Sequence, residues 1–137
     1  MGRLAEDAVA KLSTERSETL RALLGIAEED CQKKVPWYGR EQSIGHMLRN
    51  FTSHELDHFQ HLHRLMAARG QKLTEAHLLL MKAQAALAEF QVMALSLSDE
   101  EFVRPGPNEG DWSAAQVVEH VTEQEKQYRG AILSGLD

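Results

Sequence analysis

The stretch SIGHMLRNFTSHELDHFQHLHRLMAARG, residues 43–70, decides the fold expected for this chain of 137 residues. It opens with Ser43, a residue type that favours the N-cap of a helix, and it closes with Gly70, a residue type that often follows the last turn. Between them, apolar side chains recur every three or four residues, which predicts one long amphipathic helix. Its apolar stripe consists of Ile44, Met47, Leu48, Phe51, Leu62, Leu65 and Met66.

The region before this helix predicts a second helix followed by a loop. Residues 4–30 also place apolar side chains three and four residues apart. The segment 34–40 contains a proline, a glycine and two aromatic residues, a composition that favours a loop. We therefore expect a helix over about 4–30 and no regular structure between it and Ser43.

The region after Gly70 predicts two more long helices. Residues 73–95 are rich in alanine, leucine, methionine and glutamine, which are good helix formers. Ser98 and Glu101 have capping-box spacing and predict one short helical turn. Ser113 and Gln116 repeat that spacing at the start of a last helix. No strand alternation or hairpin signal is evident, so the sequence predicts an all-α four-helix bundle.

The two halves of the chain resemble each other. Residues 1–70 and 71–137 align without a gap, so that Ser43 falls on Ser113 and Glu55 falls on Glu125. We interpret the chain as a single domain, residues 1–137, built from two pseudo-repeated helix pairs.

Composition and charge exclude several classes of protein. The net charge is −6, and eleven of the acidic residues lie in 71–137 against five Lys and Arg residues there, which disfavours nucleic-acid binding. No apolar run approaches the roughly 20 residues that span a bilayer, and no lipidation motif is present. One cysteine, Cys31, excludes an internal disulfide. The N-terminus is acidic and does not resemble a signal peptide. We expect a cytoplasmic protein without a nucleic-acid or membrane partner.

Histidines carry the strongest chemical signal. The chain has seven, and five of them lie between positions 46 and 63. His54 and His58 are one turn apart and share the face that we expect to be buried, so both imidazoles can bind one divalent ion. His61 lies one further turn along and could join them, whereas His63 is off the stripe. The best third ligand is His120, which follows the apolar stripe of the last helix between Val117 and Val121.

Two other metal motifs are matched only in part. Residues 54–58 spell the H-E-x-x-H of zinc peptidases, but those enzymes need strands that this helical chain does not predict. Glu55 and His58 match half of a di-iron motif, and no second Glu-x-x-His copy accompanies them. We therefore expect neither a peptidase nor a di-iron site within one chain.

Several short motifs together resemble the DinB/YfiT-like metalloenzyme family. They are the sequences of residues 112–121 (WSAAQVVEHV), 97–105 (LSDEEFVRP) and 43–60, the last with the His-x3-His pair. The resemblance implies a four-helix bundle in which three histidines from two helices hold a divalent metal. Family members include metal-dependent hydrolases and enzymes that use low-molecular-weight thiols. In the usual order the helix with a single histidine comes first, so the halves of this chain are exchanged.

These observations lead to one functional hypothesis and one alternative. His54, His58 and His120 are expected to bind one Zn²⁺ or Ni²⁺ ion, with Glu55 and Glu125 as the catalytic carboxylates. Three protein ligands with an open position are typical of a catalytic metal, so we expect a small-molecule substrate, which the resemblance extends to thiols. The reaction is hydrolysis or thiol-dependent transfer, and the sequence does not separate the two. The alternative is a non-catalytic, metal-stabilised helical dimer or sensor module.

A homodimer is also expected. The predicted link 70–73 between the second and third long helices reaches at most about 14 Å, which is too short for a crossover along the bundle that the resemblance implies. Exchange of halves between two chains would then bring His54 and His58 of one chain to His120 of the other.

Overall fold

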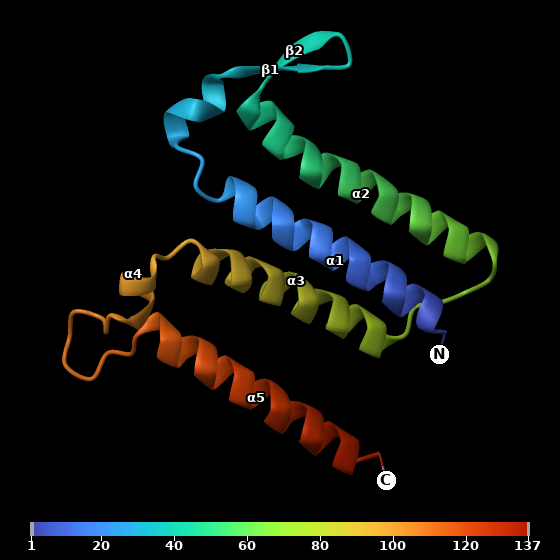
Figure 1. Cartoon of the computed structure of the whole chain (residues 1–137). Coiled ribbons are helices and arrows are strands. Elements are labelled where there is room, and N and C mark those ends of the chain that lie inside the picture. The colour runs from blue at the N-terminus through green and yellow to red at the C-terminus, as the bar shows by residue number, and fades with distance from the viewer. Residues whose placement is uncertain (1, 137) are drawn as a thin grey trace. The chain divides into compact units, whose positions relative to one another are not determined.

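The structure is a computed structural model that describes residues 2–136, and most of these residues are helical (Figure 1). The chain divides into two compact units, Met1–Ala83 and Gln84–Asp137. The predicted all-α class is confirmed at this level, with one small hairpin added. The elements are α1 (Arg3–Leu23), the 3-10 helix η1 (Glu28–Gln32), β1 (Lys34–Trp37), β2 (Arg40–Ser43), α2 (Ile44–Ala68), α3 (Glu75–Leu95), α4 (Asp99–Val103) and α5 (Ala114–Ser134).

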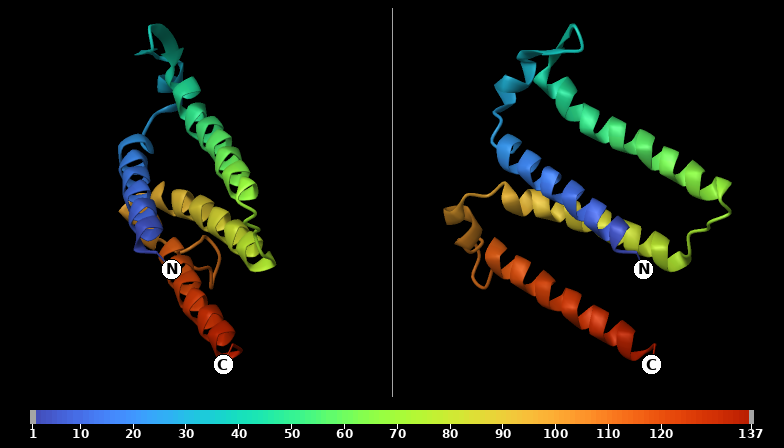
Figure 2. Two further views of the ribbon diagram at one scale, coloured as in Figure 1. Left: turned by 90° about the vertical axis from the view of Figure 1, so that its right-hand side faces the viewer. Right: turned by 45° about the vertical axis from the view of Figure 1, so that its right-hand side comes forward.

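The long helix α2 begins and ends as the sequence predicts. The Ser43 hydroxyl accepts a hydrogen bond from the backbone N–H of His46 at 3.0 Å, which satisfies one free donor of the first turn. At the other end, Gly70 adopts a positive φ of 71°. The N–H groups of Gly70 and Gln71 donate to the carbonyls of Ala67 and Met66, which is the Schellman arrangement. Figure 2 shows α2 as one unbroken helix between the hairpin and this turn.

The segment before α2 is a β-hairpin, and the expectation of a structureless loop is wrong. β1 pairs antiparallel with β2, from Lys34 opposite Ser43 to Trp37 opposite Arg40. The two residues between the strands, Tyr38 and Gly39, both have positive φ, as a tight two-residue turn with matching twist requires. The sequence signal was weak because tyrosine rarely occupies that position.

The first helix is shorter than predicted. α1 ends at Leu23, and the chain passes through Gly25 into η1. The apolar spacing beyond Leu23 came from Leu24, Ile26 and Ala27, which lie in the connection between α1 and η1. η1 lies against the start of α2, where a Cβ on Gly45 would be 3.3 Å from the carbonyl oxygen of Cys31. Glycine therefore permits the close approach of α2 to η1.

The second unit is organised by two capping boxes, both predicted. Ser98 and Glu101 exchange hydrogen bonds between side chain and backbone at the start of α4, and Ser113 and Gln116 do so at the start of α5. α4 packs against α5. Ser113 is 6% exposed and is the one buried residue among residues 2–136.

α3 has a cap of its own and an unusual composition. The Thr74 hydroxyl accepts from the N–H of His77, and Nδ1 of His77 accepts from the N–H of Thr74. Of the helices within residues 2–136, α3 alone is long and apolar enough to cross a membrane, a test that core helices of soluble proteins also meet. Lys82 and Glu89 interrupt the apolar sequence of α3, so the helix does not contain an unbroken apolar run.

The apolar stripes remain open to solvent. No hydrophobic residue between positions 2 and 136 is buried, and Phe51 and Leu62 on the stripe of α2 are 41% and 55% exposed. The expectation that the face with His54 and His58 is buried is therefore wrong for the described chain, because no second layer of helices covers α2 within its unit. Helix caps and local contacts define each element.

Removal of the α5 cap is predicted to destabilise the protein. Ser113→Ala deletes the oxygen that accepts from Gln116 N–H at 3.2 Å, and such losses cost about 1 kcal/mol. Urea unfolding followed by circular dichroism measures the change. Ser134→Ala is the control, because it removes only a hydroxyl that donates back to the carbonyl of Ala131 near the helix end. Equal stability of the two variants would contradict the role of the cap.

The capping box of α4 predicts an acid-sensitive contribution to stability. The backbone N–H of Ser98 donates to the Glu101 carboxylate and is the main cause that lowers the pKa of Glu101 below its usual value of 4.5. A lowered pKa in the folded state stabilises the fold above the unfolded-state pKa, and this contribution disappears as the pH falls through the folded-state value. Glu101→Gln keeps an acceptor but cannot ionise. Its unfolding midpoint in urea, measured from pH 7 to pH 2, should fall less steeply with acid than that of the native chain, and identical slopes would refute the prediction.

Candidate metal centre

His54 and His58 lie side by side on α2. Their ring centroids are 4.4 Å apart and the ring planes meet at 67°. The pairing follows from the helix, because residues four apart are neighbours on one face. Both residues are exposed, so their nitrogens are accessible to an ion from solvent. This pair fits two ligands of a divalent ion.

His61 continues the same row. Its ring centroid is 5.8 Å from that of His58. Three imidazoles therefore follow one another along one side of α2.

The predicted carboxylate Glu55 is held by an arginine from another helix. Arg16 of α1 forms an ion pair with Glu55, and its guanidinium also lies over the Phe51 ring, 5.6 Å from the centroid. These two contacts connect α1 with α2 one turn from His58. The Glu55 carboxylate is thereby held beside the histidine row, which suits a group that positions a ligand or transfers a proton.

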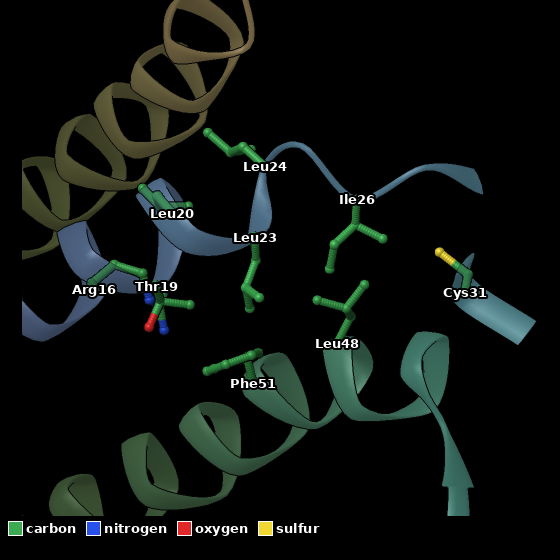
Figure 3. A pocket seen from close by; sticks show the side chains of 9 residues that line it. All are labelled: Arg16, Thr19, Leu20, Leu23, Leu24, Ile26, Cys31, Leu48 and Phe51. Carbon is green, nitrogen blue, oxygen red and sulfur yellow. The ribbon is translucent and has the colours of Figure 1, made fainter. Parts of the chain in front are cut away.

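An apolar pocket of 330 Å³ lies between α1, η1 and α2. Figure 3 shows Leu23 and Phe51 pointing toward one another across it, as do Ile26 and Leu48. Its volume is within the range of small-molecule sites. Arg16 contributes to the wall, so the pocket adjoins the Arg16–Glu55 pair. The lining residues are Arg16, Thr19, Leu20, Leu23, Leu24, Ile26, Cys31, Leu48 and Phe51.

In the second unit, His120 packs against Trp112. The ring centroids are 5.2 Å apart with an interplanar angle of 60°. Trp112 is positioned by the loop before α5, in which the Trp112 carbonyl accepts from the N–H of Gly106 at 3.2 Å and Pro105 bridges to Ser113. Trp112, at the entry to α5, thus also restrains the His120 ring.

Glu125 lies on the exposed surface of α5. Its neighbour Glu123 pairs with Lys126 at 3.0 Å. The pairing leaves Glu123 engaged in a surface ion pair, so Glu125 is the better placed of the two for chemistry on this helix.

The predicted ligands belong to different units. His54, His58 and Glu55 lie in the first unit, and His120 and Glu125 lie in the second. Within residues 2–136, no group of three or more His, Cys, Asp or Glu side chains comes together to hold a metal ion. The structure therefore brings together two of the three predicted ligands.

Comparison with known proteins does not assign the chain to a family. No family model matches the sequence, and no curated protein and no solved structure matches the chain.

Sequence reasoning missed Arg16. A signal for it exists, because Arg16 falls between Leu12 and Leu20 at four-residue spacing, in the middle of the apolar stripe of α1. A charged residue in such a stripe needs a partner, and Glu55 is that partner.

A double-mutant cycle should detect the contact between α1 and α2. Arg16→Met keeps an apolar stem over Phe51 and Glu55→Gln keeps the shape of the side chain, so the cycle isolates the ion pair. Because both side chains are partly exposed, we expect a coupling energy of about 0.2–1 kcal/mol in urea unfolding. The same substitutions at Arg21 and Glu18, which pair within α1, report helix stability alone. Zero coupling between Arg16 and Glu55 would show that the two helices do not meet there.

Proposed function

We propose that this protein is a metal-dependent enzyme that binds one divalent ion, Zn²⁺ or Ni²⁺, through His54, His58 and His120. The observation that carries the proposal is the pair of adjacent, exposed imidazoles on α2, 4.4 Å apart. The resemblance of residues 43–60 and 97–121 to the DinB/YfiT-like family supports the same ligand set and a bundle of that type. We further propose that the protein acts on a small-molecule substrate in the cytoplasm and has no nucleic-acid or membrane partner.

The residues around the histidine pair suit ligand binding and proton transfer. When bound, such an ion supplies Lewis acidity for hydrolysis or for transfer to a low-molecular-weight thiol. Glu55, which pairs with Arg16, would accept a proton from a substrate near His58. The apolar pocket next to Arg16 offers a site for the non-reacting part of a small substrate.

His120 and Glu125 would complete the site from α5. The contact of His120 with Trp112 restricts the ring and reduces the conformational entropy lost on binding. Glu125 corresponds to Glu55 in the alignment of the halves. In the proposed assembly His120 joins the pair within one chain or, by exchange of halves, between two chains.

The alternative function is a non-catalytic module in which the metal stabilises a helical dimer or senses the ion. The pocket that adjoins the Arg16–Glu55 pair favours the catalytic function, because a small substrate needs such a pocket. Glu55→Gln separates the two. It should lower turnover on a panel of thiol and amide substrates and leave metal affinity unchanged for an enzyme, and it should change neither for a structural module.

Removal of any of the three imidazoles is predicted to weaken metal binding. His54→Ala, His58→Ala and His120→Ala should each lower affinity by at least about a hundredfold, since loss of a partner in the outer shell alone costs 10–100-fold. Elemental analysis and competition with a chromogenic chelator measure stoichiometry and affinity. Circular dichroism should show unchanged helix content.

His63→Ala is the matched control, because His63 lies off the histidine row on the same helix, and it should bind one ion per chain. His120→Ala is the most informative variant, because His120 is assigned as a ligand only by the resemblance and by the alignment of the two halves. Full binding by His120→Ala together with loss of binding by His61→Ala would show that the site lies within α2 and that the proposed ligand set is wrong.

A further inference from the structure

α3 has apolar side chains on two opposite faces. Successive residues are about 100° apart around a helix axis, and on this basis one apolar face is formed by Leu79, Ala83, Ala86, Leu87 and Phe90. The opposite face, called the heptad face below, is formed by Leu78, Met81, Ala85, Ala88, Val92 and Leu95. Polar residues separate the two. A helix of this kind needs apolar cover on both sides.

The chain by itself leaves this surface open. On the heptad face, Leu78 is 48% exposed and Leu95 is 60% exposed.

The spacing on the heptad face is that of a helix-pairing seam. Its residues alternate three and four apart, as the a and d positions of a coiled coil do. The two small residues, Ala85 and Ala88, lie in the middle, and large residues lie toward both ends. The pattern reads similarly in both directions about the midpoint of Ala85 and Ala88. Such a face matches an antiparallel copy of itself, with close backbone approach at the alanines.

The charges beside the seam favour the same pairing. Lys82 and Glu89 lie along one edge of the heptad face, and Gln84 and Gln91 lie along the other. In an antiparallel pair centred between Ala85 and Ala88, Lys82 of each chain lies opposite Glu89 of the second copy. Parallel pairing would place Lys82 beside His77 and Glu89 beside Gln84. The antiparallel arrangement therefore gains two ion pairs that the parallel one lacks.

We propose that a second copy of this chain covers the heptad face, with the two α3 helices packed antiparallel about a twofold axis between Ala85 and Ala88. The opposite face, with Leu79 and Phe90, is then left for helices of the same half of the dimer. Lipid is a poorer cover, because Lys82 and Glu89 would enter the bilayer core unpaired. This interface goes beyond the proposed function and does not depend on a bound metal.

Charge exchange at the seam tests the proposal. In buffer with EDTA, the native chain should sediment with twice the mass of 15.4 kDa. Lys82→Glu and Glu89→Lys each create two like-charge contacts and should raise the dimer Kd about tenfold. An equimolar mixture of the two variants restores both ion pairs and should form a heterodimer with near-native Kd. Lys11→Glu on α1 makes the same change of charge away from the seam and should leave the Kd unchanged.

Cysteine cross-linking tests the direction of the helices. In a Cys31→Ser background, chains with Ala85→Cys should form a disulfide with chains carrying Ala88→Cys when the two are mixed and oxidised. Each variant alone should cross-link far less, since its two thiols lie on opposite sides of the axis.

Three results would overturn the proposal. The first is a 15.4 kDa monomer at micromolar concentration, whether it stays in solution or floats with lipid vesicles. The second is a mixture of the charge variants that associates no better than each alone. The third is efficient cross-linking of Ala85→Cys with itself, which indicates parallel helices. Because these measurements are made in EDTA, they do not test the metal site. The histidine variants test that site separately.

Discussion

Removal of apolar surface from water is the constraint on which this chain depends most. Each helix is well defined by its own caps, yet no hydrophobic residue within positions 2–136 is buried. An amphipathic helix obtains most of its stability from packing of its apolar face, so the helices need one another or a second chain. α3 needs such packing most, because it is apolar on two sides. It also connects the helix with His54 and His58 to the half of the chain with His120.

The proposed assembly and the proposed site have the same origin. α2 contributes two imidazoles and a carboxylate held by Arg16, and α5 contributes one imidazole restrained by Trp112. In the proposed assembly, the surface that covers α3 would also determine which α5 meets which α2. Dimerisation through α3 would thus order the two histidine helices before an ion binds and would reduce the entropic cost of assembling three ligands.

Local signals made much of the fold predictable. Ser43, Ser98, Ser113 and Gly70 mark helix ends through hydrogen bonds with their own neighbours, and each acts as predicted. The hairpin was missed because its turn places a tyrosine at positive φ, against the usual preference for glycine or asparagine. The extent of the first helix was overestimated because the apolar spacing continued past Gly25 to Ala27, in the connection before η1.

The candidate site was predictable only where a single helix forms it. The spacing of His54 and His58 fixes their proximity, and the structure has them in contact. Arg16 is 39 positions from Glu55, and no local rule predicts a pairing over that separation. The choice between His61 and His120 as third ligand depends on how the helices pack against one another. Periodicity shows which face of each helix is apolar, but it does not show which helices meet.

The central claim is that three imidazoles from two helices share one ion. X-ray absorption spectroscopy on the purified chain with one equivalent of Zn²⁺ counts the ligands directly. The account predicts three imidazole nitrogens at about 2.0–2.1 Å, with one of them lost in His120→Ala. A first shell with a sulfur atom from Cys31, or the same imidazole count in His120→Ala, would contradict it.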